Sequence, residues 1–339
     1  MELEKQKLIL EIPDFETPAD TVDIEEELRM KALEKIIYTG IPYLDLALDG
    51  ILPNDVVLVG AKTGVGKSEL VATIASTNAQ MGKRVHFFAL EAERYEVERR
   101  LKYRLIAKRY YERINDSLCD LKSSNKKMNF SNWWKGKLKP EVDQIADLVK
   151  KDISEKYKTL FIFYRKGGDF GLDQLEAQIL SIKNKTDLII IDHLHYIDFD
   201  DSNENAAMGR ITKKIRDLAL YSGIPIILVA HLRKTDKKNR SLVPELEDFH
   251  GSKNIINIAT KAVLIGPCYD AMEKPTEYAT YMRVAKNRLD GSRARYIARC
   301  VWDASKNSYD QRFALSATTF DDQTFEKLTE DQKPDWAKN

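Results

Sequence analysis

Two kinds of apolar pattern alternate along the chain, one typical of buried strands and the other of helices. Short runs rich in Val, Ile, Leu and Phe predict strands of a parallel sheet, because such strands are buried on both faces. These runs occupy residues 55–60, 84–91, 160–164, 188–192 and 223–231. The helices predicted from apolar residues at helical spacing are 69–82, 172–182 and 204–222. The alternation predicts the α/β class, with a mostly parallel, twisted sheet flanked by helices.

The ends of the chain and one internal segment depart from this alternation. Residues 1–22 contain two prolines and no stable periodicity, so we expect an acidic, extended arm there. Residues 23–37 have helical spacing with acids in the first turn, which suits a helix N-terminus. The main domain is expected over 38–315, with a charged helical insertion at about 92–157 and a polar tail at 316–339, whose last twenty residues are expected to be frayed.

The last predicted strands lack the crossover helices of a parallel sheet. They are expected at 262–266, 279–285 and 294–302, and a hairpin through Leu289, Asp290 and Gly291 joins the last two. Antiparallel strands need only such short connections. We therefore expect an antiparallel extension of the sheet near the C-terminus.

Composition restricts the class of protein without identifying it. Apolar residues make up 43% and charged residues 32% of the 339, which allows a large core under a solvated surface. No run approaches the roughly 18 apolar residues that span a membrane, and the first residues do not resemble a secretory signal. The three cysteines are far apart, which disfavours a disulfide framework or a zinc site. We expect a cytoplasmic protein with no membrane contact.

Charge is nearly balanced overall but concentrated in two segments. The net charge of +1 neither supports nor excludes binding to nucleic acid. Residues 1–27 carry ten acidic and two basic side chains, while 232–240 carry five basic and one acidic. The second segment is either a loop that faces phosphates or an ordinary solvated surface.

A phosphate-binding motif follows the first predicted strand. It matches GxxxxGK[ST] except at its first position, and its residues are Ala61, Lys62, Thr63, Gly64, Val65, Gly66, Lys67 and Ser68. A buried strand before the motif and a helix after it are the context that a P-loop requires. The glycines let backbone N–H groups surround a phosphate at the helix N-terminus. We expect Lys67 to contact the β- and γ-phosphates of ATP or another NTP, and Ser68 to ligate Mg²⁺.

Three residues at the ends of other strands complete a predicted hydrolysis site. Asp192 closes the most apolar strand, as the Walker B aspartate does, and is expected to hold Mg²⁺. Glu91 ends the strand after the P-loop helix, where a carboxylate can orient the attacking water; neighbouring Glu93 is the alternative. His231 ends a strand at the level where it can sense the γ-phosphate, although a lone histidine is as often structural.

These segments resemble the motor domain of DnaB-type replicative helicases and of the phage primase-helicase and mitochondrial Twinkle group. The resemblance covers about residues 37 to 313 and begins with TGIPYLDLALDGILPNDVVLVGAKTGVGKS, which includes the alanine in place of the first Walker glycine. GKRVHFFALEAE is similar to the strand that carries the family's catalytic glutamate, which maps to Glu91. DLIIIDHLHYI resembles its Walker B segment, with His195 where many members have glutamine. ILVAHLRK resembles the phage branch in placing a histidine, His231, at the sensor position.

The resemblance implies a RecA-like P-loop NTPase core, a DNA helicase activity and a homo-oligomeric, hexameric ring. MRVAKNRLDG is similar to the strand that supplies a basic pair to the neighbouring subunit, which maps Lys286 and Arg288 to a piston lysine and an arginine finger. We expect no counterpart of the DnaB collar domain or of a primase in this chain. We therefore expect the ring to depend on the motor and on 23–37, by analogy with the family's linker helix.

The resemblance also implies two loops that grip single-stranded DNA, at 199–210 and 232–251. The first is acidic, although Arg210 can donate hydrogen bonds. The basic residues of the second are Arg233, Lys234, Lys237, Lys238 and Arg240. Such backbone contacts are sequence-independent and sensitive to salt. The Trp133–Trp134 pair is either a stacking platform or part of the core of the helical insertion, and the core is favoured.

The leading interpretation is an NTP-driven replicative helicase, with a loader or primase as a further partner and a phage or plasmid as a plausible source. A RecA/RadA-type recombination ATPase shares the core, but the KNR-x-x-G strand favours the helicase. A regulatory RecA-like switch without nucleic acid is a second alternative, and the basic segment 232–240 counts against it. A kinase is disfavoured because Glu91 and His231 suit hydrolysis.

Overall fold

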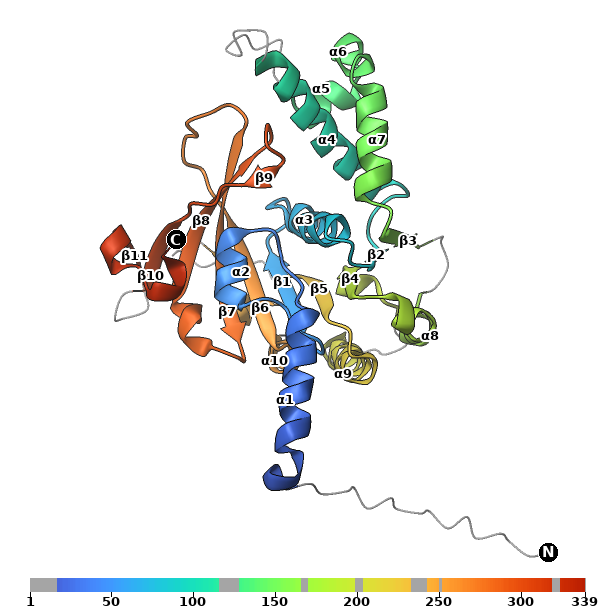
Figure 1. Ribbon diagram of the computed structural model, residues 1–339, viewed down its shortest axis with the longest axis vertical. Helices are drawn as coiled ribbons and strands as arrows, with labels where there is room; N and C mark the ends of the chain where they lie inside the picture. The colour runs from blue at the N-terminus through green and yellow to red at the C-terminus, as the bar shows by residue number, and fades with distance from the viewer. Residues whose placement is uncertain are drawn as a thin grey trace, which may run out of the picture.

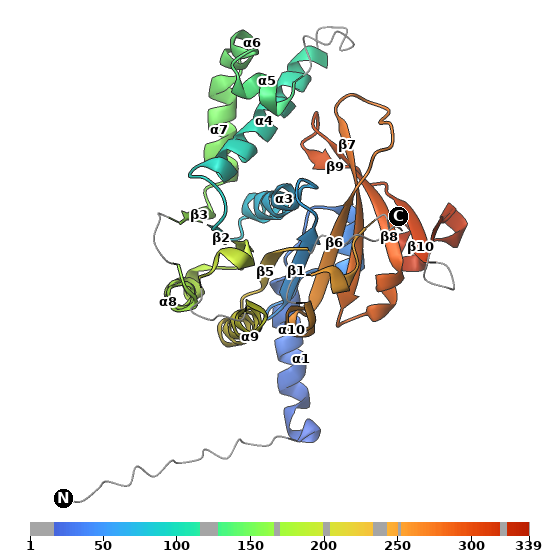
Figure 2. The same cartoon turned by 180° about the vertical axis from the view of Figure 1, so that it is seen from behind.

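One extended sheet organises the protein, as a computed structural model describes it for residues 17–115, 128–165, 170–198, 204–232, 243–249, 252–318 and 324–338 (Figures 1 and 2). The strands are β1 (Val56–Ala61), β2 (Val85–Ala89), β3 (Leu160–Tyr164), β4 (Leu188–Asp192), β5 (Ile226–His231), β6 (Lys261–Pro267), β7 (Glu277–Asn287), β8 (Tyr296–Asp303), β9 (Ser308–Tyr309), β10 (Ala314–Thr318) and β11 (Phe325–Lys327). The described strands follow the order β11-β10-β8-β7-β6-β1-β5-β4-β2-β3, with β9 beside β8.

Strand direction divides the sheet into two parts. Strands β6, β1, β5, β4, β2 and β3 pair in parallel, whereas β7, β8, β10 and β11 pair antiparallel. The predicted α/β class, with a mostly parallel sheet and an antiparallel C-terminal extension, is confirmed. In the parallel part, the carboxyl ends of β1, β2, β4 and β5 lie on the same side of the molecule. These are the four strands at whose ends the sequence predicts the residues of the nucleotide site.

Helices cover both faces of the parallel part. The helices are α1 (Pro18–Glu34), α2 (Pro42–Leu48), α3 (Lys67–Gln80), α4 (Glu96–Asn115), α5 (Phe130–Trp134), α6 (Lys139–Asp143), α7 (Ala146–Lys156), α8 (Leu172–Ile182), α9 (Glu204–Ser222) and α10 (Ser252–Ile258). Short 3₁₀ turns are η2 (Lys183–Lys185), η3 (Leu194–Tyr196), η4 (Leu246–Asp248), η5 (Gly291–Arg295), η6 (Glu330–Gln332) and η7 (Asp335–Ala337).

Each face of the sheet has its own apolar core. Val57 and Val59 of β1 pack with residues of α2 and α3 on one face, whereas Val56 and Leu58 pack with α8, α9 and α10 on the other. This alternation follows from the two-residue period of a strand. A buried, β-branched strand such as β1 is therefore fixed in register, and it holds the loop that follows it in a defined place.

The charged segment between β2 and β3 forms a helical projection above the sheet (Figure 1). Helices α4 and α7 pack on each other around a third apolar cluster that includes Leu105, Tyr110 and Val149. Trp133 packs against this cluster and lies 5.6 Å from the Tyr103 ring, as the core interpretation expects. Trp134 differs, because 57% of it is exposed and the Arg99 guanidinium lies over its ring.

The structure differs from the prediction at both ends of the chain. Helix α1 begins at Pro18, so the prediction of an extended arm is wrong for 18–22; proline suits the first turn of a helix because its missing N–H has no partner there anyway. The prediction that the last twenty residues are frayed is wrong for 324–338. Ala337 is buried, and the Trp336 ring lies 5.4 Å from that of Tyr296.

Helix α1 projects away from the body of the protein (Figures 1 and 2). Its large apolar side chains do not pack into a core of the described residues, and Val22, Ile24 and Leu28 are each at least 55% exposed. Among the described residues, no helix combines the length and the apolar character that crossing a bilayer requires.

Candidate active site

The P-loop connects the buried strand β1 to helix α3, as its motif predicts. Ala61 is the last residue of β1, and Lys67 is the first of α3. Gly64 and Gly66 have φ angles of 81° and 109°, a region that residues with a Cβ rarely adopt. A Cβ on Gly64 would meet no atom within 4 Å, so the glycine there is required by the backbone conformation. The loop thereby presents the N-terminus of α3, which attracts phosphate.

Lys67 is held inside this loop. Its Nζ donates a hydrogen bond to the Ala61 carbonyl oxygen at 3.1 Å, and only 8% of the residue is exposed. Burial lowers the pKa of Lys67, while the carboxylates of Glu91 and Asp192 oppose that shift. The side chain is thus an ammonium group with little solvent and two acidic neighbours, which suits a contact with phosphate oxygens.

Asp192 lies beside the P-loop at the end of β4. It is 5% exposed, and the Ser68 hydroxyl donates a hydrogen bond to its carboxylate. Burial and the neighbouring Glu91 carboxylate raise the pKa of Asp192 to about 6, although the hydrogen bond from Ser68 and the charge of Lys67 oppose that shift. Its buried Oδ1 accepts no hydrogen bond from the described residues. A buried carboxylate oxygen without a partner, next to a hydroxyl, fits the oxygen ligands that Mg²⁺ prefers.

Glu91 approaches the same edge from β2. This strand ends at Ala89, so the prediction that Glu91 itself ends the strand is wrong by two residues. The N–H groups of Leu90 and Glu91 both donate to the Asp192 carbonyl oxygen, at 2.7 and 3.3 Å, which ties the turn to the end of β4. The Glu91 side chain is 42% exposed and therefore open to water. Glu93, the alternative base, lies two residues further on, in the turn before α4 begins at Glu96.

His193 is a residue of this site that the sequence analysis did not identify. It follows Asp192 directly, is fully buried, and its Nε2 lies 3.2 Å from Glu91 Oε2 and in contact with His231 Nε2. Burial, with the positive neighbours around it, lowers the pKa of His193 to about 2, so the ring is neutral. The His195 backbone N–H donates to its Nδ1 at 3.3 Å, which leaves the ring proton on Nε2. The sequence signal was a histidine directly after the Walker B aspartate.

Lys286 and Arg288 lie toward the opposite ends of the strands from the P-loop. Ala61 is level with Met282 of β7, through the pairing of both strands with β6. Lys286 is further along β7 by four residues, which is about 13 Å at about 3.3 Å per residue. The two basic side chains therefore cannot act on the P-loop of their own chain without a large rearrangement.

The basic pair instead contacts the end of α10. Lys286 Nζ donates to the Ile256 carbonyl oxygen at 2.6 Å, and Arg288 Nη2 donates to that of Asn257 at 2.7 Å. Cations at a helix C-terminus are favourable, because the last carbonyl groups have no partner within the helix.

The residues expected to bind DNA are mostly outside the described part of the chain. Arg233, Lys234, Lys237, Lys238 and Arg240 all fall in 233–242, which the structure does not describe. Arg210 is exposed on α9 and lines a hollow of about 710 Å³ together with His195 and Gln174.

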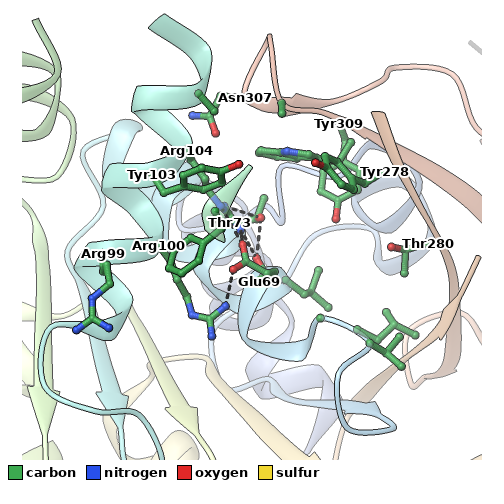
Figure 3. Close-up of a pocket in the computed structure, with 18 of the residues that line it drawn as sticks. Glu69, Thr73, Arg99, Arg100, Tyr103, Arg104, Tyr278, Thr280, Asn307 and Tyr309 are labelled. Carbon is green, nitrogen blue, oxygen red and sulfur yellow. Dashed lines mark hydrogen bonds and ion pairs between the residues drawn. The ribbon is translucent and has the colours of Figure 1, made fainter. Parts of the chain in front are cut away.

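A cavity of about 690 Å³ opens beside the P-loop (Figure 3). Val65 and Gly66 reach it from the loop, and Tyr278 and Trp302 are among the aromatic residues on the side of β7 and β8. On the opposite side, Glu69 of α3 forms ion pairs with Arg100 and Arg104 of α4, at 2.6 Å each. These pairs attach the P-loop helix to the helical projection.

Comparison with known proteins agrees with this geometry. The sequence profile of the DnaB-like helicase C-terminal domain matches residues 37–296. The chain is 21% identical over 226 residues to a DNA helicase/primase of Enterobacteria phage T3, covering 63% of this chain and 35% of that protein. It is 24% identical over 259 residues to a probable plasmid replicative DNA helicase of Chlamydia muridarum, covering 74% and 51%. The chain thus spans about a third to a half of the length of these relatives.

Solved structures of low sequence identity share the fold. The ATPase domain of G40P superposes with a TM-score of 0.59 at 18% identity, covering 93% of this chain and 100% of that one. A DnaB-like replicative helicase, solved in a study of its interactions with primase, gives a TM-score of 0.58 at 18% identity, covering 94% and 68%. With a profile match over most of its length, the chain belongs to the DnaB-like helicase C-terminal domain family.

Proposed function

We propose that this protein is an ATP-driven helicase motor that assembles into a hexameric ring, moves along single-stranded DNA and separates the duplex during replication. The observation that carries the proposal is the meeting of Lys67, Asp192 and Glu91 at the carboxyl edge of the parallel strands, in a chain of the DnaB-like family. Carboxylates and an ammonium group in this arrangement suit hydrolysis of a nucleoside triphosphate.

Each side chain has a defined task in the proposed hydrolysis. Ser68 and Asp192 hold Mg²⁺, which neutralises phosphate charge when it is bound. Lys67 contacts the β- and γ-phosphates. Glu91 is exposed enough to meet a water molecule and acts as its general base, a role worth roughly 10²–10⁴ in rate. His231 responds to the presence of the γ-phosphate.

The proposed ring places every site between two chains. Lys286 and Arg288 act on the nucleotide of the neighbouring subunit, which agrees with their position away from their own P-loop. An arginine supplied in this way stabilises charge on the transferred phosphoryl group. Hydrolysis then depends on assembly, because a single chain lacks one side of the site.

Helix α1 is the proposed contact between neighbouring chains. Its exposed apolar side chains, such as Ile24 and Leu28, need an apolar partner surface. Between the helical projection and β3 lies an open groove of about 670 Å³, whose lining includes Leu101, Trp134 and Ile162 beside charged residues such as Lys102 and Lys158. Light scattering tests this contact: Leu28→Ser should yield smaller particles than wild type, whereas Glu25→Ser on the same helix should not.

The test of the whole proposal is steady-state ATP hydrolysis with and without single-stranded DNA, at low and moderate salt. Strong stimulation that weakens with salt is expected, because backbone contacts release counterions. Unwinding of forked duplexes with either tail then follows. A rate that DNA leaves unchanged would contradict an autonomous helicase and favour a regulatory ATPase.

A further inference from the structure

Three side chains of metal-ligand type meet at the edge of the sheet: Glu91, His193 and His231. One donor atom of each lies within 4.8 Å of the others. The residues lie at the carboxyl ends of β2, β4 and β5, which are neighbours in the sheet in the order β5-β4-β2. Their convergence is therefore a consequence of strand pairing. The proposed hydrolysis assigns no task to His193.

We propose that Glu91, His193 and His231 form a binding site for a divalent transition-metal ion of the Zn²⁺ class. One carboxylate with two imidazoles is the donor set of zinc sites that keep a fourth position for water. Imidazole nitrogen suits Zn²⁺, Cu²⁺ and Ni²⁺, whereas Mg²⁺ prefers oxygen donors. The site is thus chemically distinct from the oxygen pair of Ser68 and Asp192.

The geometry supplies one rigid ligand and an open path to it. His193 is fully buried, whereas Glu91 is 42% exposed and admits an ion and its water from solvent. The 3.2 Å between Glu91 Oε2 and His193 Nε2 is close to the separation of two donors in a tetrahedral site, about 3.3 Å for bonds of about 2.0–2.1 Å. The facing nitrogens of His193 and His231 are closer than this and move apart when an ion enters.

Coordination also requires a change of tautomer. The proton on His193 Nε2 moves to Nδ1, and the 3.3 Å hydrogen bond from the His195 backbone N–H is given up. One long hydrogen bond between neutral groups is exchanged for a metal–nitrogen bond. The ring stays neutral throughout, which is the form in which imidazole binds a metal ion.

The consequence for the enzyme rests on the proposed function, whereas the metal site itself does not. An ion bound to Glu91 occupies the carboxylate that the proposal assigns to the attacking water. Zn²⁺ would therefore inhibit ATP hydrolysis while Lys67, Ser68 and Asp192 stay free to bind Mg²⁺ and nucleotide.

The first test is Zn²⁺ binding to the full chain, without nucleotide or Mg²⁺, in competition with a fluorescent zinc chelator. One ion per chain is expected, with affinity about a hundredfold lower in Glu91→Gln and in His193→Asn, since losing even an outer partner costs roughly 10–100-fold. Glu93→Gln and His195→Asn are the matched controls and should bind as wild type does. Glu91 is exposed, so its variant decides the question if His193→Asn fails to fold. Unchanged affinity in Glu91→Gln would overturn the site.

A second test identifies the donors and separates this site from the hydrolysis mechanism. Co²⁺ bound in place of Zn²⁺ should show the visible bands of nitrogen and oxygen ligands; thiolate charge-transfer bands would move the ion to a cysteine and overturn the proposal. ATP hydrolysis should then fall with Zn²⁺ at the concentration at which Zn²⁺ binds. Binding without inhibition would support the metal site and contradict Glu91 as the base. Inhibition that survives in His193→Asn would contradict the metal site alone.

Discussion

Replacing Asp192 with asparagine should make the nucleotide-free protein more stable at neutral pH. Burial raises the pKa of Asp192 from 3.8 to about 6, because the ionised carboxylate has lost its water and Oδ1 has no partner among the described residues. This rise in the pKa of Asp192 corresponds to about 3 kcal/mol of folding free energy. Removing the ionisable group removes that cost.

The raised pKa of Asp192 determines the sign of this effect on stability and the pH range in which it occurs. A carboxyl group with a raised pKa favours the folded state while it is protonated, so its stabilising contribution is complete below pH 3.8 and is lost as pH rises through about 6. The difference in stability between wild type and Asp192→Asn should therefore change by about 3 kcal/mol across this window, in favour of the variant at high pH. About half of this change should fall between pH 5 and 7.5.

The assay is urea unfolding of both proteins at a series of pH values, in EDTA and without nucleotide. Subtracting the free energy of unfolding of one protein from that of the other cancels the contribution of groups that titrate alike in both. Adding Mg²⁺ and ADP should then stabilise wild type far more than the variant, because Asp192 is a proposed ligand. Parallel stability curves for the two proteins between pH 4 and 7.5 would refute the account of Asp192 as a strained, buried acid.

The remaining predictions concern hydrolysis. Lys67→Ala should abolish turnover, because the phosphates lose the buried ammonium group; measurable steady-state activity in the variant would contradict this. Glu91→Gln should retain nucleotide binding while hydrolysing ATP roughly 10²–10⁴ times more slowly. Glu93→Gln is the control and should hydrolyse ATP at the wild-type rate. An equal loss of hydrolysis in both variants would leave the base unassigned. Arg288→Ala should retain nucleotide binding but lose steady-state ATP hydrolysis, because the neighbouring nucleotide loses its arginine; hydrolysis at the wild-type rate would refute the role of Arg288.

The parts of the fold that were predicted well have a strong local pattern. The helices at 172–182 and 204–222 and the strands at 160–164 and 188–192 have the boundaries that the sequence predicts. In each, the apolar period is uninterrupted and polar or turn residues border it, so local signals and tertiary packing agree.

The ends of the chain were predicted less well, because their structure depends on distant contacts or on an ambiguous residue. Pro18 is ambiguous, because a proline can interrupt a helix but also favours its first turn. Trp336 packs on Tyr43 and Tyr296, which are far from it in sequence. A polar segment with one aromatic anchor does not show a pattern that predicts such a contact.

The candidate site likewise contains residues that local sequence predicts and residues that only the fold brings together. Lys67, Ser68 and Asp192 belong to motifs in which neighbouring residues and secondary structure predict a role. The proximity of His193 to Glu91 and His231 arises only when three strands pair, so no spacing within the sequence predicts it. The contact of Arg288 with the end of α10 likewise depends on the order of strands in the sheet.

The separation of Arg288 from the P-loop has a genetic consequence. If each site joins the surface of one chain that carries the P-loop to the surface of the next chain that carries Arg288, two inactive alleles can complement each other. In a mixed ring, a chain carrying Arg288→Ala retains a sound P-loop, and a neighbour carrying Lys67→Ala retains a sound arginine, so the interface between those two faces is whole. Two alleles that damage the same surface, such as Lys67→Ala and Glu91→Gln, leave no whole interface in any mixture. Pairwise crosses of such alleles would therefore map the two surfaces of the subunit without a structure.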